Sequence, residues 1–127
     1  MVNVTAFFRD SKAFASLQKN VVDPLVQQTP LSRPIRIWVA GCATGEEAYT
    51  IAILFLEECR IQKKHLPLRI FATDAHQQSL AVAQAGFYET DKVKNVPTSL
   101  LETYFEPVDG GYQVREEVRK QITFFQH

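Results

Sequence analysis

Apolar and polar positions follow two patterns in turn along the chain, which predicts alternating strands and helices. The short apolar runs "IRIWVAG" from Ile35 and "LRIFATD" from Leu68 are rich in β-branched and aromatic residues, as buried parallel strands are. Each run precedes a segment with helical spacing, from Glu46 to about Arg60 and then in "QQSLAVAQAGFY", which ends near Gly86. Such successive units predict an α/β fold with a doubly wound, Rossmann-like parallel sheet.

The segments around these two units are shorter. "SKAFASLQKNVV" predicts a leading helix with Asp10 or Ser11 as its cap and with Pro24 kinking or ending it. Toward the end, "VPTSLLETYF" indicates a short helix, "VDGGYQV" a turn or hairpin, and "ITFFQ" a third strand. A three-stranded sheet is small for this fold class and leaves the first strand with an open edge. We therefore expect a truncated domain, with a leading helical segment at 1–34 and the first half of the sheet at 35–127.

Composition narrows the possible functions. The chain has 127 residues, with 14 basic residues against 14 acidic ones, so it lacks the basic excess of nucleic-acid binding proteins. It has neither a secretion leader nor an apolar run of roughly 20 residues, so we expect a cytoplasmic protein without membrane insertion. Cys42 and Cys59 are predicted to be free thiols, because a strand end and a distant turn of the following helix lie beyond disulfide reach.

The segment "GCATGEE" joins the first predicted strand to its helix. Ligands of open α/β sheets bind at the carboxyl ends of the strands, and the glycines of the loop from Gly41 to Gly45 allow close approach of a ligand. A helix N-terminus favours anions, but here it carries Glu46 and Glu47. These carboxylates would repel a pyrophosphate, so the loop favours a ligand with a nearby cationic group, such as an ammonium or a sulfonium. A capping box, in which Thr44 caps the helix and Glu47 reaches back, is an equally simple reading.

Asp74 ends the second predicted strand, where a nucleotide-binding sheet places the acid that accepts hydrogen bonds from ribose hydroxyls. Its alternative role is to cap the helix that begins near His76 or Gln77. The two features together suggest an adenosyl ligand with its ribose at Asp74 and its charged tail near Glu47. S-adenosylmethionine contains both parts, an adenosyl group and a tail with a positive charge.

Several spaced motifs, in order, resemble one family. They are "NVTAFFRD" from Asn3, "GCATGEEAYTIA" from Gly41, "FATD" from Phe71, "AQAGFY" from Ala83 and the final "FFQH". The chain resembles the CheR family of chemotaxis-type protein-glutamate O-methyltransferases, which use S-adenosylmethionine and have a class I methyltransferase sheet. The resemblance covers nearly the whole chain and is strongest to versions fused to a methylesterase domain.

The resemblance implies a role for individual positions. Asn3, Thr5 and Arg9 would border the cofactor, and Arg9, close to the methyl transfer centre, would orient the substrate carboxylate by a bidentate pair. Glu47 would contact the methionine portion and Asp74 the ribose. The implied substrate is a receptor-type protein with methylatable glutamates, and further domains of the same polypeptide are implied.

These residues also have simpler interpretations. Arg9 can be a solvated charge at a helix start, and Asn3 and Thr5 can be turn residues. The aromatic residues of the motifs are expected in the core rather than against adenine, namely Phe7, Phe8, Trp38 and Tyr49. No metal site is expected, because His65, His76 and His127 share no spacing.

The chain also departs from the family pattern. Ala75 and His76 follow "TD" where the family usually has an apolar residue and another acid, which changes the ribose end of the pocket. The preceding helical domain and the later strands of the family are outside this sequence. We therefore expect the 127-residue chain alone to bind the cofactor weakly and to methylate poorly or not at all.

Two other classes of protein are compatible with parts of the pattern. A non-catalytic S-adenosylmethionine-binding or regulatory module in a signalling protein would keep the fold and pocket without turnover. A nicotinamide-dependent oxidoreductase is disfavoured, because "GCATGE" lacks the G-x-G-x-x-G spacing and places glutamates where pyrophosphate would bind.

Overall fold

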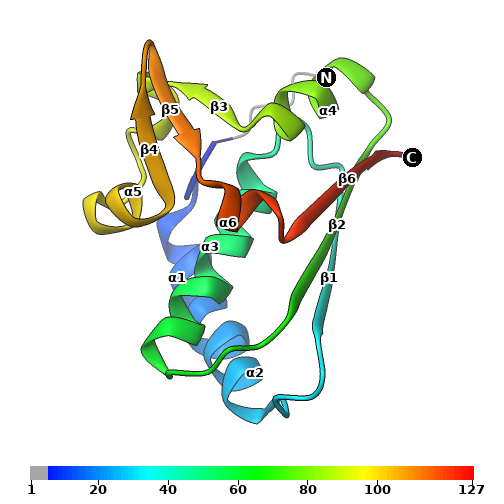
Figure 1. The fold of residues 1–127 in the computed structure, drawn as a ribbon, viewed down its shortest axis with the longest axis vertical. Coiled ribbons are helices and arrows are strands. Elements are labelled where there is room, and N and C mark those ends of the chain that lie inside the picture. The colour runs from blue at the N-terminus through cyan, green and yellow to red at the C-terminus, as the bar shows by residue number, and fades with distance from the viewer. Residues whose placement is uncertain (1–5) are drawn as a thin grey trace.

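The computed structural model describes residues 6–127, and its centre is a three-stranded parallel sheet. The strands are β1 (Ile35–Ala40), β2 (Leu68–Asp74) and β6 (Ile122–Gln126), in the order β1-β2-β6. All three run in the same direction, as Figure 1 shows. The parallel α/β sheet predicted from the apolar runs is confirmed, and no strand within residues 6–127 pairs with the outer edge of β1, as expected.

Two crossover helices cover one face of this sheet. They are α3 (Glu46–Ile61), which contacts β2, and α4 (Gln77–Ala85), which contacts β2 and β6. Helix α4 ends at Gly86, whose φ of 69° is the left-handed conformation predicted for a helix C-terminus. The sheet side chains buried beneath these helices alternate along the strands and are Ile35, Val39, Leu68, Ile70, Ala72 and Ile122.

The opposite face of the sheet is exposed within the described residues. Trp38, Phe71 and Phe125 are 64%, 39% and 44% exposed. The expectation that Trp38 belongs to the core is therefore wrong, because alternation along β1 directs it away from the helices. Its indole Nε1 donates to Thr73 Oγ1 at 3.0 Å on the neighbouring strand. Consecutive strands joined by crossovers of one hand place their helices on the same face, so the first half of a doubly wound sheet leaves the other face uncovered.

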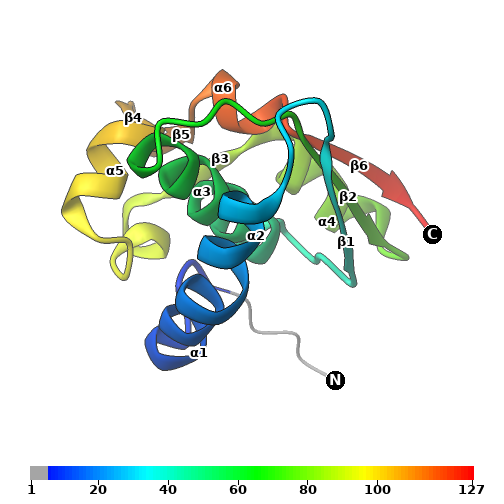
Figure 2. The same cartoon turned by 90° about the horizontal axis from the view of Figure 1, so that it is seen from below.

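The segment before the sheet is helical. It comprises α1 (Ser11–Leu17), the π-helical η1 (Gln18–Val22) and α2 (Asp23–Gln28), which Figure 2 shows beside α3. Asp10 caps α1 as predicted, because its Oδ1 accepts the N–H of Ala13 at 3.0 Å. The helical run does not end at Pro24, which lies in the first turn of α2, where a proline is tolerated.

A small antiparallel sheet with short helices lies beside α3 (Figure 1). Its strands are β3 (Phe87–Glu89), β4 (Phe105–Val108) and β5 (Gly111–Val114), in the order β3-β5-β4. The hairpin of β4 and β5 and the helix α5 (Thr98–Tyr104) match the prediction, whereas β3 was not predicted. Two short helices complete this part, η2 (Thr90–Val93) and α6 (Glu116–Arg119).

Phe7 joins the start of the described chain to the small sheet. Its side chain is fully buried, and its ring makes edge contacts with Tyr88 on β3 and Phe105 on β4, with centroids 4.8 and 5.4 Å away. Phe7 and Tyr49 are thus core residues as expected, and Phe8 is half-buried. The segment that carries Arg9 is anchored by this aromatic packing.

We expect Phe7→Ala to lower the free energy of unfolding by about 3–5 kcal/mol, because it removes a fully buried ring and leaves a cavity against the small sheet. Phe87→Ala is the matched control, since that ring is 38% exposed. Urea unfolding followed by circular dichroism measures both variants. Equal losses from the two would mean that Phe7 does not anchor the segment.

Candidate cofactor site at the carboxyl ends of the strands

The loop from Gly41 to Gly45 follows β1 and has an unusual backbone. Three of its residues have positive φ, namely Gly41 at 71°, Ala43 at 48° and Gly45 at 98°. Two hydrogen bonds shape the loop, from Cys42 N to Thr73 O and from Gly45 N to Cys42 O, both 2.9 Å. For Ala43 the left-handed conformation is unfavourable by roughly 1–2 kcal/mol, so neighbouring contacts must hold it.

Asp74 supplies one of these contacts. Its Oδ2 accepts the N–H of Ala43 at 2.8 Å, and its Oδ1 accepts the N–H of His76 at 2.8 Å. The hydrogen bonds from His76 and Ala43 hold the pKa of Asp74 below its ordinary value, so the carboxylate is ionised at neutral pH. The alternative in which Asp74 caps α4 is wrong, because the N-cap is His76, without a side-chain cap, and Asp74 binds the N–H of His76 before the helix begins. The same carboxylate also ties β2 to the glycine loop, which sequence reasoning did not predict.

The start of α3 differs from the predicted capping box. Gly45 is the N-cap, without a side-chain cap, and Thr44 Oγ1 instead donates to the Glu46 carboxylate. Because Gly45 has a left-handed backbone, the helix begins one residue later than a Thr44 cap requires. Glu46 is 2% exposed, whereas Glu47 is exposed to solvent. Of the two predicted glutamates, only Glu47 is thus accessible to a ligand.

The thiol of Cys42 lies near both accessible carboxylates, Asp74 and Glu47, at the carboxyl edge of the sheet. Burial, together with the negative charges of Asp74 and Glu47, raises the pKa of its thiol to about 11. Both acids therefore lie close enough to Cys42 to act on it electrostatically. The edge is negative, as the sequence interpretation requires for a cationic ligand.

The glycine loop leaves room on its outer side. A Cβ added to Gly41 would meet no atom within 4 Å, so this glycine faces open space beside Asp74's strand. Open backbone next to an ionised acid at the strand ends is the arrangement that holds the ribose in nucleotide-binding sheets. The residues present thus fit an adenosyl group, because an ionised acid and open backbone lie together at the strand ends.

The inner side of the loop is filled by residues that sequence reasoning missed. Tyr88 Oη donates to Thr44 O at 2.6 Å. A Cβ added to Gly45 would lie 3.0 Å from Tyr88 Oη and 2.8 Å from Ala83 Cβ. Tyr88 belongs to the quoted motif "AQAGFY", but sequence alone assigned it no role. The small sheet therefore contacts the glycine loop directly through Tyr88.

The predicted residues of the first motif are only partly placed. Phe8 has a φ of 50°, and its N–H donates to Thr50 Oγ1 at 3.3 Å, one turn of α3 beyond Glu46. The next residue, Arg9, is exposed and lies between this anchor and the Asp10 cap of α1. Asn3 and Thr5 lie outside the described residues.

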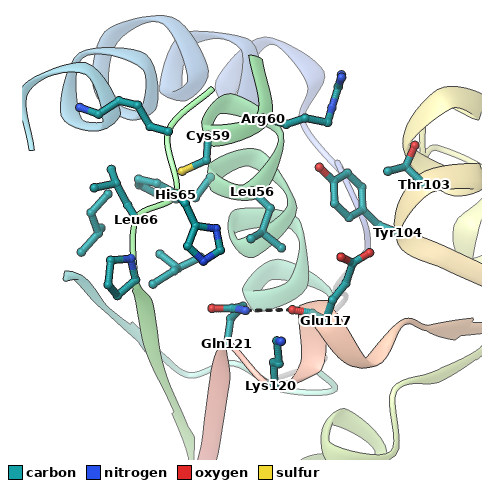
Figure 3. Close-up of a pocket in the computed structure, with 15 residues that line it drawn as sticks. Leu56, Cys59, Arg60, His65, Leu66, Thr103, Tyr104, Glu117, Lys120 and Gln121 are labelled. Carbon is teal, nitrogen blue, oxygen red and sulfur yellow. Dashed lines mark hydrogen bonds between the residues drawn. The ribbon is translucent and has the colours of Figure 1, made fainter. Parts of the chain in front are cut away.

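A cavity of about 470 Å³ lies at the other end of the sheet, where β1 and β2 begin at Ile35 and Leu68. Figure 3 shows His65, Tyr104, Glu117 and Lys120 around it. Tyr104 Oη donates to Glu57 Oε2 at 2.7 Å. No residue of the glycine loop lines this cavity, so it is separate from the candidate cofactor site.

The described part of the chain has two further negative findings. Among residues 6–127, no group of three or more histidine, cysteine or acidic side chains is placed to hold a metal ion. Within the same range, every helix is too short or too polar to pass through a lipid bilayer. Both cysteines of the chain are free.

Comparison with known proteins identifies the family. The profile described as "CheR methyltransferase, SAM binding domain" matches residues 3–127. A chemotaxis protein methyltransferase 2 of Vibrio cholerae is 37% identical over 126 residues, covering 98% of this chain and 43% of that protein. A chemotaxis protein methyltransferase of Borreliella burgdorferi is 36% identical over 125 residues, covering 96% of the chain and 44% of that protein.

A third relative is much larger. An uncharacterized 104.1 kDa protein of Rhodobacter capsulatus is 42% identical over all 127 residues, which are 13% of its length. The chain thus spans less than half of each of these relatives. It belongs to the family of CheR methyltransferase S-adenosylmethionine-binding domains, and S-adenosylmethionine is its cofactor.

We expect Cys42 to resist alkylation in the folded protein. With a pKa of about 11, roughly one thiol in a thousand is ionised at pH 8, and the side chain is only 1% exposed. Iodoacetamide should therefore modify the half-buried Cys59 before Cys42, and Cys42 should react faster as pH rises or in urea. Peptide mass spectrometry measures both rates. Modification of Cys42 at the rate of an unfolded peptide would contradict the described loop.

Proposed function

We propose that this chain is the first half of a methyltransferase sheet in a protein that transfers a methyl group from S-adenosylmethionine to glutamate carboxylates of chemoreceptor-type proteins. The observation that carries the proposal is the convergence of Asp74, Glu47 and the open backbone at Gly41 on one edge of the sheet. Membership of the CheR family supports the same cofactor.

The proposed binding mode uses the charges of this edge. Asp74 has each oxygen engaged by one backbone N–H, and a carboxylate oxygen has a further lone pair for a ribose hydroxyl. Glu47, exposed in the first turn of α3, faces the cationic part of the ligand. A pyrophosphate ligand is disfavoured there by the same two charges. Because a nicotinamide dinucleotide contains a pyrophosphate, the same repulsion disfavours a nicotinamide-dependent oxidoreductase.

The substitution at His76 leaves the ribose end intact in this proposal. Its backbone N–H holds Asp74, and its ring Nδ1 lies 2.9 Å from Ser79 Oγ on the same helix. The side chain is thus engaged with α4. The departure from the family pattern therefore does not remove the acid that the ribose requires.

The chemistry left to the chain is mainly positioning. The bound cofactor supplies a sulfonium-activated methyl group. A glutamate oxygen of the substrate forms the new O–C bond as the S–C bond breaks, which yields a methyl ester and S-adenosylhomocysteine and needs no proton transfer. In-line alignment of the substrate carboxylate then governs the rate, and Arg9 is the proposed guanidinium that pairs with it.

The partners follow from this reaction. The proposed substrates are receptor-type proteins, and nucleic acid is not a proposed partner. The Vibrio and Borreliella relatives are chemotaxis protein methyltransferases, which supports a substrate in chemotaxis. The matched region is 13% of the large Rhodobacter relative, which supports further domains in the same polypeptide. A cytoplasmic location is compatible with two free thiols. Because the relatives extend well beyond the matched region, we expect this segment alone to bind cofactor weakly.

We expect Asp74→Ala in the full-length protein to weaken S-adenosylhomocysteine binding by about tenfold or more, because it removes the ribose acceptor and the tie to Ala43. Glu47→Gln should weaken it about threefold, since one exposed charge is lost. Glu102→Gln on α5, also exposed, is the matched control and should bind like wild type. Isothermal titration calorimetry measures all four proteins. A wild-type protein that does not bind would overturn the proposed function.

Arg9→Ala should reduce the turnover rate by about tenfold or more while changing S-adenosylhomocysteine affinity by less than about threefold, because its partner is the substrate carboxylate. Arg33→Ala, exposed in the connector before β1, is the control. Transfer of tritiated methyl groups to cytoplasmic fragments of chemoreceptors from the same organism measures turnover, and alkali-labile label identifies methyl esters. A protein that binds cofactor but never transfers label would instead be the non-catalytic module.

A further inference from the structure

A single buried hydroxyl connects the small antiparallel sheet to the cofactor loop. Tyr88 lies on β3, is 4% exposed and donates from Oη to Thr44 O at 2.6 Å. We infer that Tyr88 is a positioning residue for S-adenosylmethionine, which holds the glycine loop in its binding conformation from the side opposite the ligand. This inference rests on the proposed function and adds a residue and a mechanism to it.

The need for such a residue follows from the backbone of the loop. Ala43 has a positive φ of 48°, which costs roughly 1–2 kcal/mol for a residue with a Cβ. The hydrogen bond from Ala43 N to Asp74 holds one side of this residue. On the other side, the carbonyl of Thr44 has no strand partner, and the hydroxyl of Tyr88 binds it. The unfavourable conformation is thus held from both sides.

Close packing gives the hydroxyl a fixed place. A Cβ at Gly45 would come within 3.0 Å of Tyr88 Oη and 2.8 Å of Ala83 Cβ, so only glycine fits between them. Tyr49 supports the same arrangement, because its Oη donates to Ala83 O at 2.5 Å and its ring lies edge-on to Tyr88 at 6.2 Å. The loop is therefore pressed against α4 and β3 with little space to move.

The position of Tyr88 is in turn set by the N-terminal segment. Phe7 packs edge-on against the Tyr88 ring at 4.8 Å and against Phe105 of β4 at 5.4 Å. The hydroxyl of Tyr88 thus connects the segment that carries Arg9 to the loop beside Asp74. Burial raises the pKa of this hydroxyl well above its ordinary value, so it remains a protonated donor over the whole physiological range.

The loss of this hydroxyl should weaken cofactor binding without changing the chemical step. Without the hydrogen bond, Ala43 can relax toward a right-handed backbone, and cofactor binding must then restore the loop conformation. Tyr88→Phe in the full-length protein is expected to raise the dissociation constant for S-adenosylhomocysteine about three- to tenfold. The KM for S-adenosylmethionine should rise by a similar factor, with the turnover rate nearly unchanged.

Tyr104→Phe is the matched control. Its hydroxyl is also buried and donates to Glu57 at 2.7 Å, but it lies beside the cavity at the amino ends of the strands (Figure 3). Both variants lose one oxygen and one hydrogen bond, so we expect similar shifts in melting temperature. Only Tyr88→Phe should change affinity for the cofactor.

Alkylation of Cys42 supplies a readout that does not require cofactor binding. Cys42 lies two residues before Thr44 in the loop and is 1% exposed. Tyr88→Phe should speed its modification by iodoacetamide at least about threefold, whereas Tyr104→Phe should leave the rate at the wild-type value.

The outcomes separate this inference from the proposed function. If wild type binds S-adenosylhomocysteine and Tyr88→Phe binds it within twofold, or if both tyrosine variants weaken binding equally, the positioning role is wrong. If wild type does not bind, the proposed function fails, and the alkylation rates still decide whether Tyr88 holds the loop.

Discussion

The hydrogen bond between the Asp74 carboxylate and the N–H of Ala43 is the constraint on which the candidate site depends. It joins the end of β2 to the loop after β1, two segments that are far apart in the sequence. The bond places an ionised acid beside exposed backbone and holds Ala43 in an unfavourable conformation. A charged acceptor makes this contact stronger than a neutral one would, which is why a single side chain can maintain it.

The fold supports this contact from behind. Consecutive parallel strands bring their carboxyl ends to one edge, and α3 and α4 lie on the same face and fill the space beneath the loop. The small antiparallel sheet then adds Tyr88, and Phe7 packs that tyrosine against the N-terminal segment. Among the described residues, the loop is thus contacted by three parts of the chain on its inner side and has open space beside Gly41.

Negative charge is concentrated at this edge of the sheet. Glu46 is buried, and its carboxylate accepts a hydrogen bond from Thr44. Glu47 and Asp74 both raise the pKa of the Cys42 thiol. A helix N-terminus that carries accessible negative charge favours a cationic ligand over a phosphate. The family profile, which concerns S-adenosylmethionine binding, agrees with that reading of the charges.

Local patterns of the sequence predict much of the fold. The runs at Ile35, Leu68 and Ile122, the helical spacing between them and the glycine at Gly86 predicted the parallel sheet and its crossovers, because periodicity and turn residues act over a few positions. The order of several motifs was sufficient for the family resemblance. Asp74 could likewise be singled out from its position at a strand end.

Tertiary structure decided what lies far apart in the sequence. Only the fold shows that Trp38 faces away from the helices, that Glu46 is buried beside an exposed Glu47, and that Thr44 is not the helix cap. Only the fold brings the Tyr88 hydroxyl to the carbonyl of Thr44. A local pattern specifies which face of an element is apolar. It does not specify which distant element covers that face, and the chemistry of this loop depends on those contacts.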